Sequence, residues 1–317
     1  MVSRAVRCQF IRNYDQSMAS RGAPQNATAL RFRNFRRYWS CGALGAFDGL
    51  IFSLALLTTI GFQVLSNFAN DLGDSQKGTD NAQRVGPARA IQSGQLSAAQ
   101  MKKGMWVVGL LSLVSALLLI KVSILNLSTT AIYTYVFLAV LCIAAAITYT
   151  VGKNAYGYRG LGDVMVFLFF GLVSVIGVFG LYGESFEWLV LFPAISIGAW
   201  STAVLNLNNL RDVQNDAQMQ KRTMVVQLGY EKGKIYHVFL VASGLATWFF
   251  TVYLLAISTY NYYLFVSLLP SVGLFLHLKK VLETHTPAEL DPELKKVALL
   301  TFFSALLFAI LLNFAPH

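Results

Sequence analysis

The chain has 317 residues, of which 56% are hydrophobic and only 13% are charged, and its mean hydropathy is +0.55. A soluble domain of average composition has roughly a quarter charged residues, so the composition excludes an ordinary soluble protein and indicates an integral membrane protein. The net charge of +10 is typical of basic loops facing the cytoplasm and an anionic lipid surface. No soluble segment interleaves basic and aromatic residues, so we expect no nucleic acid partner. Three cysteines without paired spacing argue against a disulfide framework and a zinc site.

The first segment, residues 1–47, differs in composition from the rest of the chain, because it holds eight arginines and no lysine. Three interpretations are open. The segment is an arginine-rich targeting sequence, or a weakly apolar extra span around "YWSCGALGAFDG", or the product of an altered coding start that replaces an apolar first helix. We expect the third, and we separate this atypical segment from a membrane domain over residues 48–317.

Eight apolar runs follow, each of about 20 residues, which is the length that crosses a bilayer as a helix. We place them at residues 49–69, 105–125, 131–151, 163–182, 187–206, 236–256, 261–278 and 297–314. Pro270 and Gly273 interrupt the seventh run, which a helix packed among neighbours tolerates. The sequence therefore predicts an all-α bundle of eight clear transmembrane helices in a lipid bilayer.

The loops between these runs alternate in charge. Every second loop is basic, and the four basic loops together carry sixteen lysines and arginines, whereas the loops between them carry none. Because basic loops remain in the cytoplasm, we expect these four on the cytoplasmic side. Eight spans would then put the eight arginines of residues 1–47 outside, against the bias that the other loops obey. The charge pattern therefore predicts a ninth span that the eight runs do not include.

Two matching polar clusters stand at the cytoplasmic ends of the first and fifth runs. Residues four and seven or eight positions apart lie on one face of a helix. The clusters are Asn67, Asp71 and Asp74 in "SNFANDLGDSQKGTD", and Asn208, Asp212 and Asp216 in "LNLNNLRDVQNDAQMQKRT". The repeated Asn-x3-Asp spacing indicates a weak internal duplication with one site shared between the two halves.

Carboxylate and amide oxygens in two facing sets are suited to Mg²⁺, which prefers one or two carboxylates together with substrate phosphate oxygens. Two such sets would clamp a diphosphate between them. Basic residues follow each cluster and would neutralise the remaining phosphate charge: Lys77 and Arg84 after the first, Lys221 and Arg222 after the second. A single acid at a helix end often only marks the membrane interface, and Asp80, in the loop, is either solvated or part of the site.

The segment "YTVGKNAYGYRGLGD" lies on the same side of the membrane. Its Tyr149, Lys153, Tyr156 and Arg159 are candidates to bind an acidic aromatic substrate, or they anchor the chain at the membrane interface. Asp163 either caps the following helix or takes part in catalysis.

The four histidines, His237, His277, His285 and His317, show no ligand or triad spacing, and we expect interfacial or loop positions for them. The stretch "ETHTPAELDPELKK" is expected to be a polar cytoplasmic linker with a short helix and no chemistry.

From Asp48 onward, the segments "NFANDLGDSQKGTDNAQRVGPARAIQSG", "YTVGKNAYGYRGLGD" and "LNNLRDVQNDAQMQKRTMVVQLG" resemble the UbiA superfamily of intramembrane prenyltransferases. The resemblance implies nine transmembrane helices around a central cavity, in a bacterial inner membrane, with the site toward the cytoplasm. It implies that Mg²⁺ binds the diphosphate of a polyprenyl diphosphate, with Asp71 and Asp212 as the central catalytic carboxylates. The motifs are most similar to those of the branch that prenylates 1,4-dihydroxy-2-naphthoate with loss of CO₂, in menaquinone biosynthesis.

Other functions remain open from the residues alone. The aromatic acceptor is the naphthoate or another acid such as 4-hydroxybenzoate. An ion-coupled secondary transporter also uses intramembrane acids, but near the midplane rather than at one face with basic companions. A non-catalytic membrane assembly factor would need neither acidic cluster.

Overall fold

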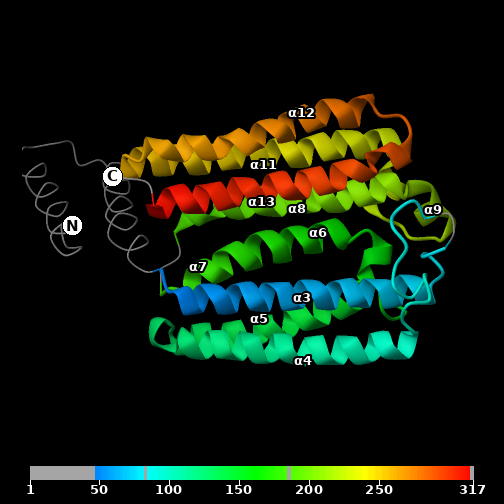
Figure 1. The fold of residues 1–317 in the computed structure, drawn as a ribbon, viewed down its shortest axis with the longest axis horizontal. Helices are drawn as coiled ribbons and strands as arrows, with labels where there is room; N and C mark the ends of the chain where they lie inside the picture. The colour runs from blue at the N-terminus through cyan, green and yellow to red at the C-terminus, as the bar shows by residue number, and fades with distance from the viewer. Residues whose placement is uncertain (1–46, 82–83, 184–186, 315–317) are drawn as a thin grey trace, which may run out of the picture.

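The computed structural model describes residues 47–81, 84–183 and 187–314, and these form helices with no β-strand among them (Figure 1). Within these residues, eight helical segments are long and apolar enough to cross a membrane. They are Gly49–Gln76, Ala98–Val122, Thr129–Thr148, Gly162–Leu181, Trp188–Arg211, Tyr230–Thr259, Tyr262–Glu283 and Pro287–Asn313. The all-α class and the eight predicted spans are confirmed, and the protein is an integral membrane protein. The expectations about the first segment and a ninth span fall on residues 1–46, which lie outside the described residues.

Several helices continue past the apolar runs at the end of the bundle that carries the polar clusters. Helix α3 (Gly49–Gln76) begins where the Asp48 side chain accepts hydrogen bonds from the backbone nitrogens of Leu50 and Ile51, at 2.8 and 3.1 Å. It then runs seven residues beyond the predicted end at residue 69. Hydropathy marks the apolar part of a helix, whereas backbone hydrogen bonding continues into polar sequence, so the first carboxylate cluster lies within the helix.

The remaining spans are α4 (Ala98–Val122), α5 (Thr129–Thr148), α8 (Leu191–Arg211), α11 (Tyr230–Thr259), α12 (Leu269–Glu283) and α13 (Asp291–Phe314), with one composite rod. That rod joins α6 (Gly162–Val166), the π-helical segment η4 (Phe167–Ile176) and α7 (Gly177–Leu181). A Cβ added at Gly171 would lie 2.6 Å from the Ala194 carbonyl oxygen and 2.7 Å from the Gly198 Cα. These glycines therefore let η4 and α8 approach backbone to backbone, as small residues do in membrane bundles.

Short elements connect the spans. They are η2 (Ile124–Asn126), η3 (Tyr156–Arg159), η5 (Trp188–Val190), α9 (Val213–Gln218), α10 (Met224–Leu228), η6 (Tyr262–Leu268) and η7 (Pro287–Leu290). Pro270 stands in the first turn of α12, directly after η6, where a proline lacks no hydrogen bond that the helix needs. It therefore opens a helix instead of interrupting one, and η7 is the short helix expected in the linker.

The helices form two groups (Figure 1). Helix α3 contacts α4 and α5 in one group, while α8 contacts α11 and α13 in the other and also contacts η4. The buried apolar side chains form separate clusters within the two groups, and the larger, which includes Trp200 and Trp248, belongs to α8 and α11–α13. Because each group has its own core, the space between them is free to form a cavity. The loop after α3, α9 and the turn between α12 and α13 all lie at one end of the bundle.

The expectation for the histidines is wrong for two of them. His237 of α11 and His277 of α12 are fully buried, and their Nε2 atoms lie 2.8 Å apart. His237 Nδ1 also contacts Asn206 Oδ1 of α8 at 3.1 Å, and His277 Nδ1 contacts the Glu293 carboxylate of α13. The chain of contacts ties four helices together. Residues forty positions apart carry no sequence signal for such a contact, since only the packing of the helices brings them together. His285 is exposed in a loop, as expected; the remaining histidine is beyond the described residues.

Candidate functional site

A cavity of about 850 Å³ lies between the two groups of helices. Its walls come from α3, α4, α5, the α6–α7 rod, α8 and α13. At the end of the bundle with the polar clusters the lining is polar and includes Asn67, Asn70, Arg89, Asn208 and Lys221. Further in, the lining is almost entirely apolar, with Ala55, Leu119, Leu138, Val173 and Leu181 among its residues. The cavity thus matches a molecule with a charged head and a long apolar tail.

The first cluster lies where α3 meets the loop that follows it. Asp74 is buried, and its Oδ2 lies 3.2 Å from Arg89 Nη1 and 3.4 Å from Lys221 Nζ. Asp71 is also buried; its Oδ2 accepts a hydrogen bond from the Ala90 backbone nitrogen at 3.0 Å, and its Oδ1 has no partner. Asn67 lines the cavity one turn earlier, so the cluster divides: the amide faces the cavity, and the carboxylates lie behind it, under the loop.

Asn70, which belongs to none of the predicted sets, links this cluster to Arg89. In one orientation the Asn70 amide hydrogen-bonds both neighbours: its nitrogen donates to Asp74 Oδ2 at 3.1 Å, and its oxygen accepts from Arg89 Nη2 at 2.9 Å. Arg89 is therefore held by Asp74 and Asn70 at the edge of the cavity that it lines.

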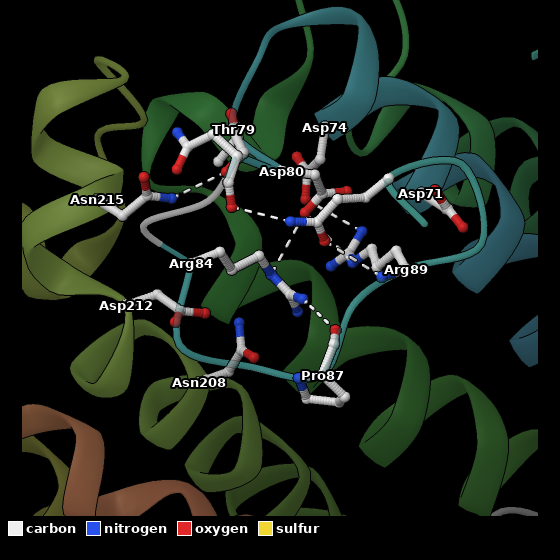
Figure 2. A network of polar contacts seen from close by, with 12 residues as sticks. Asp71, Asp74, Thr79, Asp80, Arg84, Pro87, Arg89, Asn208, Asp212 and Asn215 are labelled. Carbon is white, nitrogen blue, oxygen red and sulfur yellow. Dashed lines mark hydrogen bonds and ion pairs between the residues drawn. The ribbon is translucent and has the colours of Figure 1, made fainter. Parts of the chain in front are cut away.

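The loop after α3 folds over this cluster through Asp80 (Figure 2). The Asp80 side chain is only 1% exposed, and its Oδ1 lies 3.3 Å from Arg84 Nε and 3.5 Å from Arg89 Nε. Arg84 Nη1 donates in turn to the Pro87 carbonyl oxygen at 2.6 Å. Burial raises the pKa of Asp80, and the neighbouring arginines oppose that rise. Asp80 is thus part of the site and is not a solvated loop residue.

The second cluster stands at a break in the helix. The sequence predicts one helical face, but α8 ends at Arg211, and Asp212 has φ −98° and ψ 11°, before α9 carries Asp216. The backbone hydrogen bonds from Asp212 N to Asn208 O (3.1 Å) and from Asp216 N to Asp212 O (2.9 Å) have helical i to i−4 spacing, so the three residues still follow one another along the same side of the chain. Asp216, after this break, is buried.

Arg211 holds the second cluster together. Its Nε and Nη2 bind the two oxygens of Asp212 at 3.1 and 2.6 Å, and Nη2 also donates to Asn208 Oδ1 at 2.7 Å. Its Nη1 reaches Asp291 Oδ1, at the start of α13, at 2.6 Å. The linker to which we assigned no chemistry therefore provides a contact to the site.

Lys221 joins the two clusters. Its Nζ lies 3.4 Å from Asp74 Oδ2 and 4.0 Å from Asp216 Oδ1. Burial raises the pKa of the Asp216 carboxyl to about 7, and Lys221 works against that rise. The amide of Asn215 adds a second link, donating to the Thr79 carbonyl oxygen at 2.9 Å (Figure 2). Carboxylates 142 positions apart in the sequence thus share one ammonium group.

The predicted basic residues differ in their placement. Lys221 lines the cavity, and Arg84 lies in the loop above it. Lys77 is half-buried beside the first cluster, where burial lowers its pKa. Arg222 is exposed and is not part of the cavity lining.

The predicted acceptor residues divide in the same way. Tyr149 and Tyr156 line the cavity, with ring centroids 5.3 Å apart, whereas Lys153 and Arg159 are exposed outside it. Asp163 is buried in the first turn of α6, but the residue at the cap position is Leu161, so Asp163 is not the helix cap.

Sequence reasoning assigned no role in the site to Arg211 and Tyr158, and it counted Arg89 among the basic residues after the first cluster without including it in the predicted diphosphate-binding set. Tyr158 OH donates to Asp74 Oδ1 at 2.7 Å. Arg211 directly precedes Asp212 in "NNLRD", and Arg89 ends "RVGPAR", so both stood beside a motif and were counted only as loop charge. Tyr158 carried no signal that would distinguish it from the other tyrosines of its loop.

The donor set fits a divalent cation shared with a phosphate. Asp71 Oδ1 and Asp216 Oδ2 are buried and have no hydrogen-bond partner, and such orphaned oxygens are what a cation would satisfy. Within the described residues, no group of three or more His, Cys, Asp or Glu side chains is close enough to hold an ion alone. Mg²⁺ is commonly held by one or two carboxylates while water and substrate phosphate oxygens complete its coordination. The residues therefore suit Mg²⁺ bound together with a diphosphate.

Comparison with known proteins identifies the family of the chain. The model of the UbiA prenyltransferase family matches residues 40–306. A Haemophilus influenzae protein named 1,4-dihydroxy-2-naphthoate octaprenyltransferase is 43% identical over 83% of this chain and 84% of its own length. The Escherichia coli protein of the same name is 42% identical over 63% of this chain and 65% of its own length. A Dictyostelium discoideum protein named UbiA prenyltransferase domain-containing protein 1 is 24% identical over 64% of this chain and 58% of its own length.

No solved structure matches the chain. The family match nevertheless spans seven complete membrane helices and most of the eighth, both carboxylate clusters, and the loop that supplies Tyr149 and Tyr156. The chain belongs to the UbiA prenyltransferase family.

Proposed function

We propose that this protein is a Mg²⁺-dependent aromatic prenyltransferase. It transfers a polyprenyl group from polyprenyl diphosphate to 1,4-dihydroxy-2-naphthoate with loss of CO₂, giving the hydroquinone (reduced) form of demethylmenaquinone. The observation that carries the proposal is the cavity of about 850 Å³, which is polar and cationic at one end and apolar along the rest of its length. The choice of acceptor rests on four relatives, 35–43% identical, that are named octaprenyltransferases for this naphthoate.

The cavity would bind the prenyl donor by its two different parts. The apolar part of the cavity would accept the tail from the bilayer without specific contacts, because lipid chains and apolar side chains are similar surroundings for it. The diphosphate would lie at the polar end beside Lys221 and Arg89, with Lys77 behind them. Asp71, Asp74, Asp212 and Asp216, with Asn67 and Asn208, would hold Mg²⁺, which supplies positive charge to the diphosphate.

In this proposal the reaction separates the positive charge of an allylic cation from the negative charge of the diphosphate, in a cavity that excludes water. The allylic C–O bond breaks, the electron pair leaves with the diphosphate, and the basic side chains stabilise the charge that develops there. The electron-rich naphthoate ring attacks the allylic cation, a C–C bond forms, and the ring then loses its carboxylate as CO₂. Water would also capture the cation, so the apolar walls protect the reaction as well as binding the tail.

Tyr149 and Tyr156 stand where the acceptor ring would meet the allylic carbon. Burial raises the pKa of both phenols, so both stay protonated. Tyr156 OH is already bound to the Ala145 carbonyl oxygen at 2.9 Å, which fixes its ring as a wall. Tyr149 is therefore the phenol whose hydroxyl is placed to hydrogen-bond the acceptor.

The decisive test is an assay of purified protein in lipid with Mg²⁺, a polyprenyl diphosphate and each of several aromatic acids. We expect prenylated product and CO₂ from the naphthoate. Prenylation of 4-hydroxybenzoate without reaction of the naphthoate would contradict the acceptor. Ion-coupled uptake with no prenyl transfer to any acid would instead support a secondary transporter.

We also propose that the site faces the cytoplasm of a bacterial inner membrane. The support is that the basic loops and both carboxylate clusters share one end of the bundle (Figure 1). In a cysteine-free background, a cysteine at the exposed Ser93 should be labelled only from the cytoplasmic side, and one at the exposed Tyr262, at the opposite end, only from outside. The reverse labelling would refute the orientation.

A further inference from the structure

Tyr158 contacts Asp74 of the first carboxylate cluster and Lys221, the lysine that joins the two clusters, although it belongs to the loop whose other tyrosines line the cavity. Its hydroxyl lies 2.7 Å from Asp74 Oδ1 and 2.5 Å from Thr79 Oγ1. Its ring lies 3.8 Å from Lys77 Nζ and 5.3 Å from Lys221 Nζ. Its backbone oxygen accepts from the Arg222 nitrogen at 3.2 Å. One side chain thus joins the loops that follow α3, α5 and α8.

The hydrogen bonds of the phenol have a defined direction. A carboxylate only accepts hydrogen bonds, so the single phenolic proton points to Asp74. The Thr79 hydroxyl must therefore donate to the phenol oxygen. The resulting chain, from Thr79 through Tyr158 to Asp74, holds one oxygen of a carboxylate whose other oxygen faces Arg89 and Lys221.

The ring gathers two cations that would otherwise repel each other. Both ammonium groups lie within the distance of about 6 Å at which an aromatic face attracts a cation. Within the described residues, Lys77 makes no ion pair and no side-chain hydrogen bond, so the ring is what orients it. A cation–π contact uses none of the three N–H donors of a lysine in a hydrogen bond, and they remain available to a ligand with many acceptor oxygens.

We propose that Tyr158 is a positioning residue for the diphosphate, holding Lys77, Lys221 and Asp74 in the arrangement that receives it. This inference rests on the proposed function and deepens it. The loop between α5 and α6 then has two separate tasks: Tyr149 and Tyr156 face the acceptor, and Tyr158 faces away from it and organises the leaving group. Replacing a tyrosine that binds the acceptor, or one that only fills space, would change the KM values of the two substrates in a different way.

Two variants separate the ring from the hydroxyl. Tyr158→Leu removes the ring and its cation–π contacts to the half-buried Lys77 and the buried Lys221. We expect affinity for diphosphate to fall about tenfold, equivalent to about 1.4 kcal/mol. Tyr158→Phe keeps the ring and should stay within about threefold of the wild type, because only the two hydrogen bonds of the hydroxyl, to Asp74 and Thr79, are lost. Tyr263→Leu is the matched control, since this exposed tyrosine lies in η6 at the opposite end of the bundle.

The first readout is binding of inorganic diphosphate with Mg²⁺, measured calorimetrically without turnover. The second is the KM for each substrate. We expect Tyr158→Leu to weaken diphosphate binding and raise the KM for the prenyl donor by similar factors, while the KM for the naphthoate stays within twofold. A raised naphthoate KM with unchanged diphosphate affinity would overturn the proposal, and so would equal losses in Tyr158→Leu and Tyr158→Phe.

The two readouts also distinguish this inference from the proposed function. If the wild type binds diphosphate with Mg²⁺ but prenylates no acceptor, the proposed function fails, and the Tyr158 variants still test the positioning role. If the wild type does not bind diphosphate, the positioning role is refuted directly.

Discussion

Replacing Arg211 by methionine should destabilise the protein more than any other single change in the second cluster. Arg211 is 4% exposed and binds Asp212, Asn208 and Asp291 through four contacts of 2.6–3.1 Å. Methionine keeps the length of the side chain but provides no charge and no donor. The change therefore leaves Asp212, itself 5% exposed, as a buried carboxylate without a partner.

The structure sets the size of the effect. Breaking a buried ion pair by removing one partner costs about 3–5 kcal/mol, because the remaining charge stays buried. The contact to Asp291 contributes far less, about 0–1 kcal/mol, since that side chain is 45% exposed and water screens it. Asp291→Asn should consequently be mild and Arg211→Met severe. In Arg211→Met/Asp212→Asn, part of the lost stability should return, because no uncompensated charge remains.

The assay is the unfolding midpoint of each purified variant in the same detergent, together with prenyl transfer. We expect the activity of Arg211→Met to fall on the order of 10²-fold, because Asn208 and Asp212 lose their orientation. The reasoning would be refuted if Asp291→Asn unfolded as easily as Arg211→Met. It would also be refuted if the double variant were less stable than the single one.

Four other changes test separate parts of the structure. Asp71→Asn keeps an oxygen that accepts the hydrogen bond from the Ala90 backbone nitrogen and loses only the charge, so prenyl transfer should fall on the order of 10²-fold. Chelation of divalent metal should abolish prenyl transfer by the wild type. Full activity in the variant would contradict the two-cluster site. Gly171→Ala forces a methyl group into the contact between η4 and α8 and should cost about 1–3 kcal/mol in the free energy of unfolding, a prediction that an unchanged unfolding midpoint would disprove. His277→Leu leaves the buried His237 Nε2 without this partner, at about 1–3 kcal/mol, and leaves Glu293 its ion pair with Lys296. The exposed His285→Leu should be neutral, so equal unfolding midpoints for the two variants would count against the buried chain. Burial raises the folded-state pKa of Asp216 from 3.8 to about 7. In metal-free protein the stability that this carboxyl contributes is therefore full below pH 3.8 and is lost as pH rises through about 7. Asp216→Asn should flatten the fall in unfolding temperature over that window, and a pH profile identical to that of the wild type would show that this carboxyl does not titrate there.

The membrane spans could be predicted from the sequence because the signal is local. Twenty apolar residues must cross a bilayer as a helix whatever their neighbours do, and the charge of each loop assigns its side without reference to contacts. The same reasoning placed both carboxylate clusters at one end of the bundle. What it missed was how far α3 continues, since hydropathy does not record a helix that runs on into polar sequence.

Contacts between residues that lie far apart in the sequence are determined by how the helices pack. Lys221 lies near both Asp74 and Asp216, and α8 ends at Arg211; no pattern in the motif marks either feature. The burial of Asp80, which the sequence left open, follows from how the loop folds back over α3.

The side chains of one loop show the same division between sequence and structure. By residue type, Lys153 and Arg159 were candidates for the site as much as their neighbours were, yet both are exposed. Tyr156 lines the cavity, and Tyr158 contacts Asp74 and Lys221. The sequence by itself determined the eight membrane spans and predicted the kind of chemistry at the end of the bundle with the carboxylate clusters, because both depend on local composition. Only the tertiary structure decided the partner of each charge, because burial and distance arise when faces of helices far apart in the chain come together.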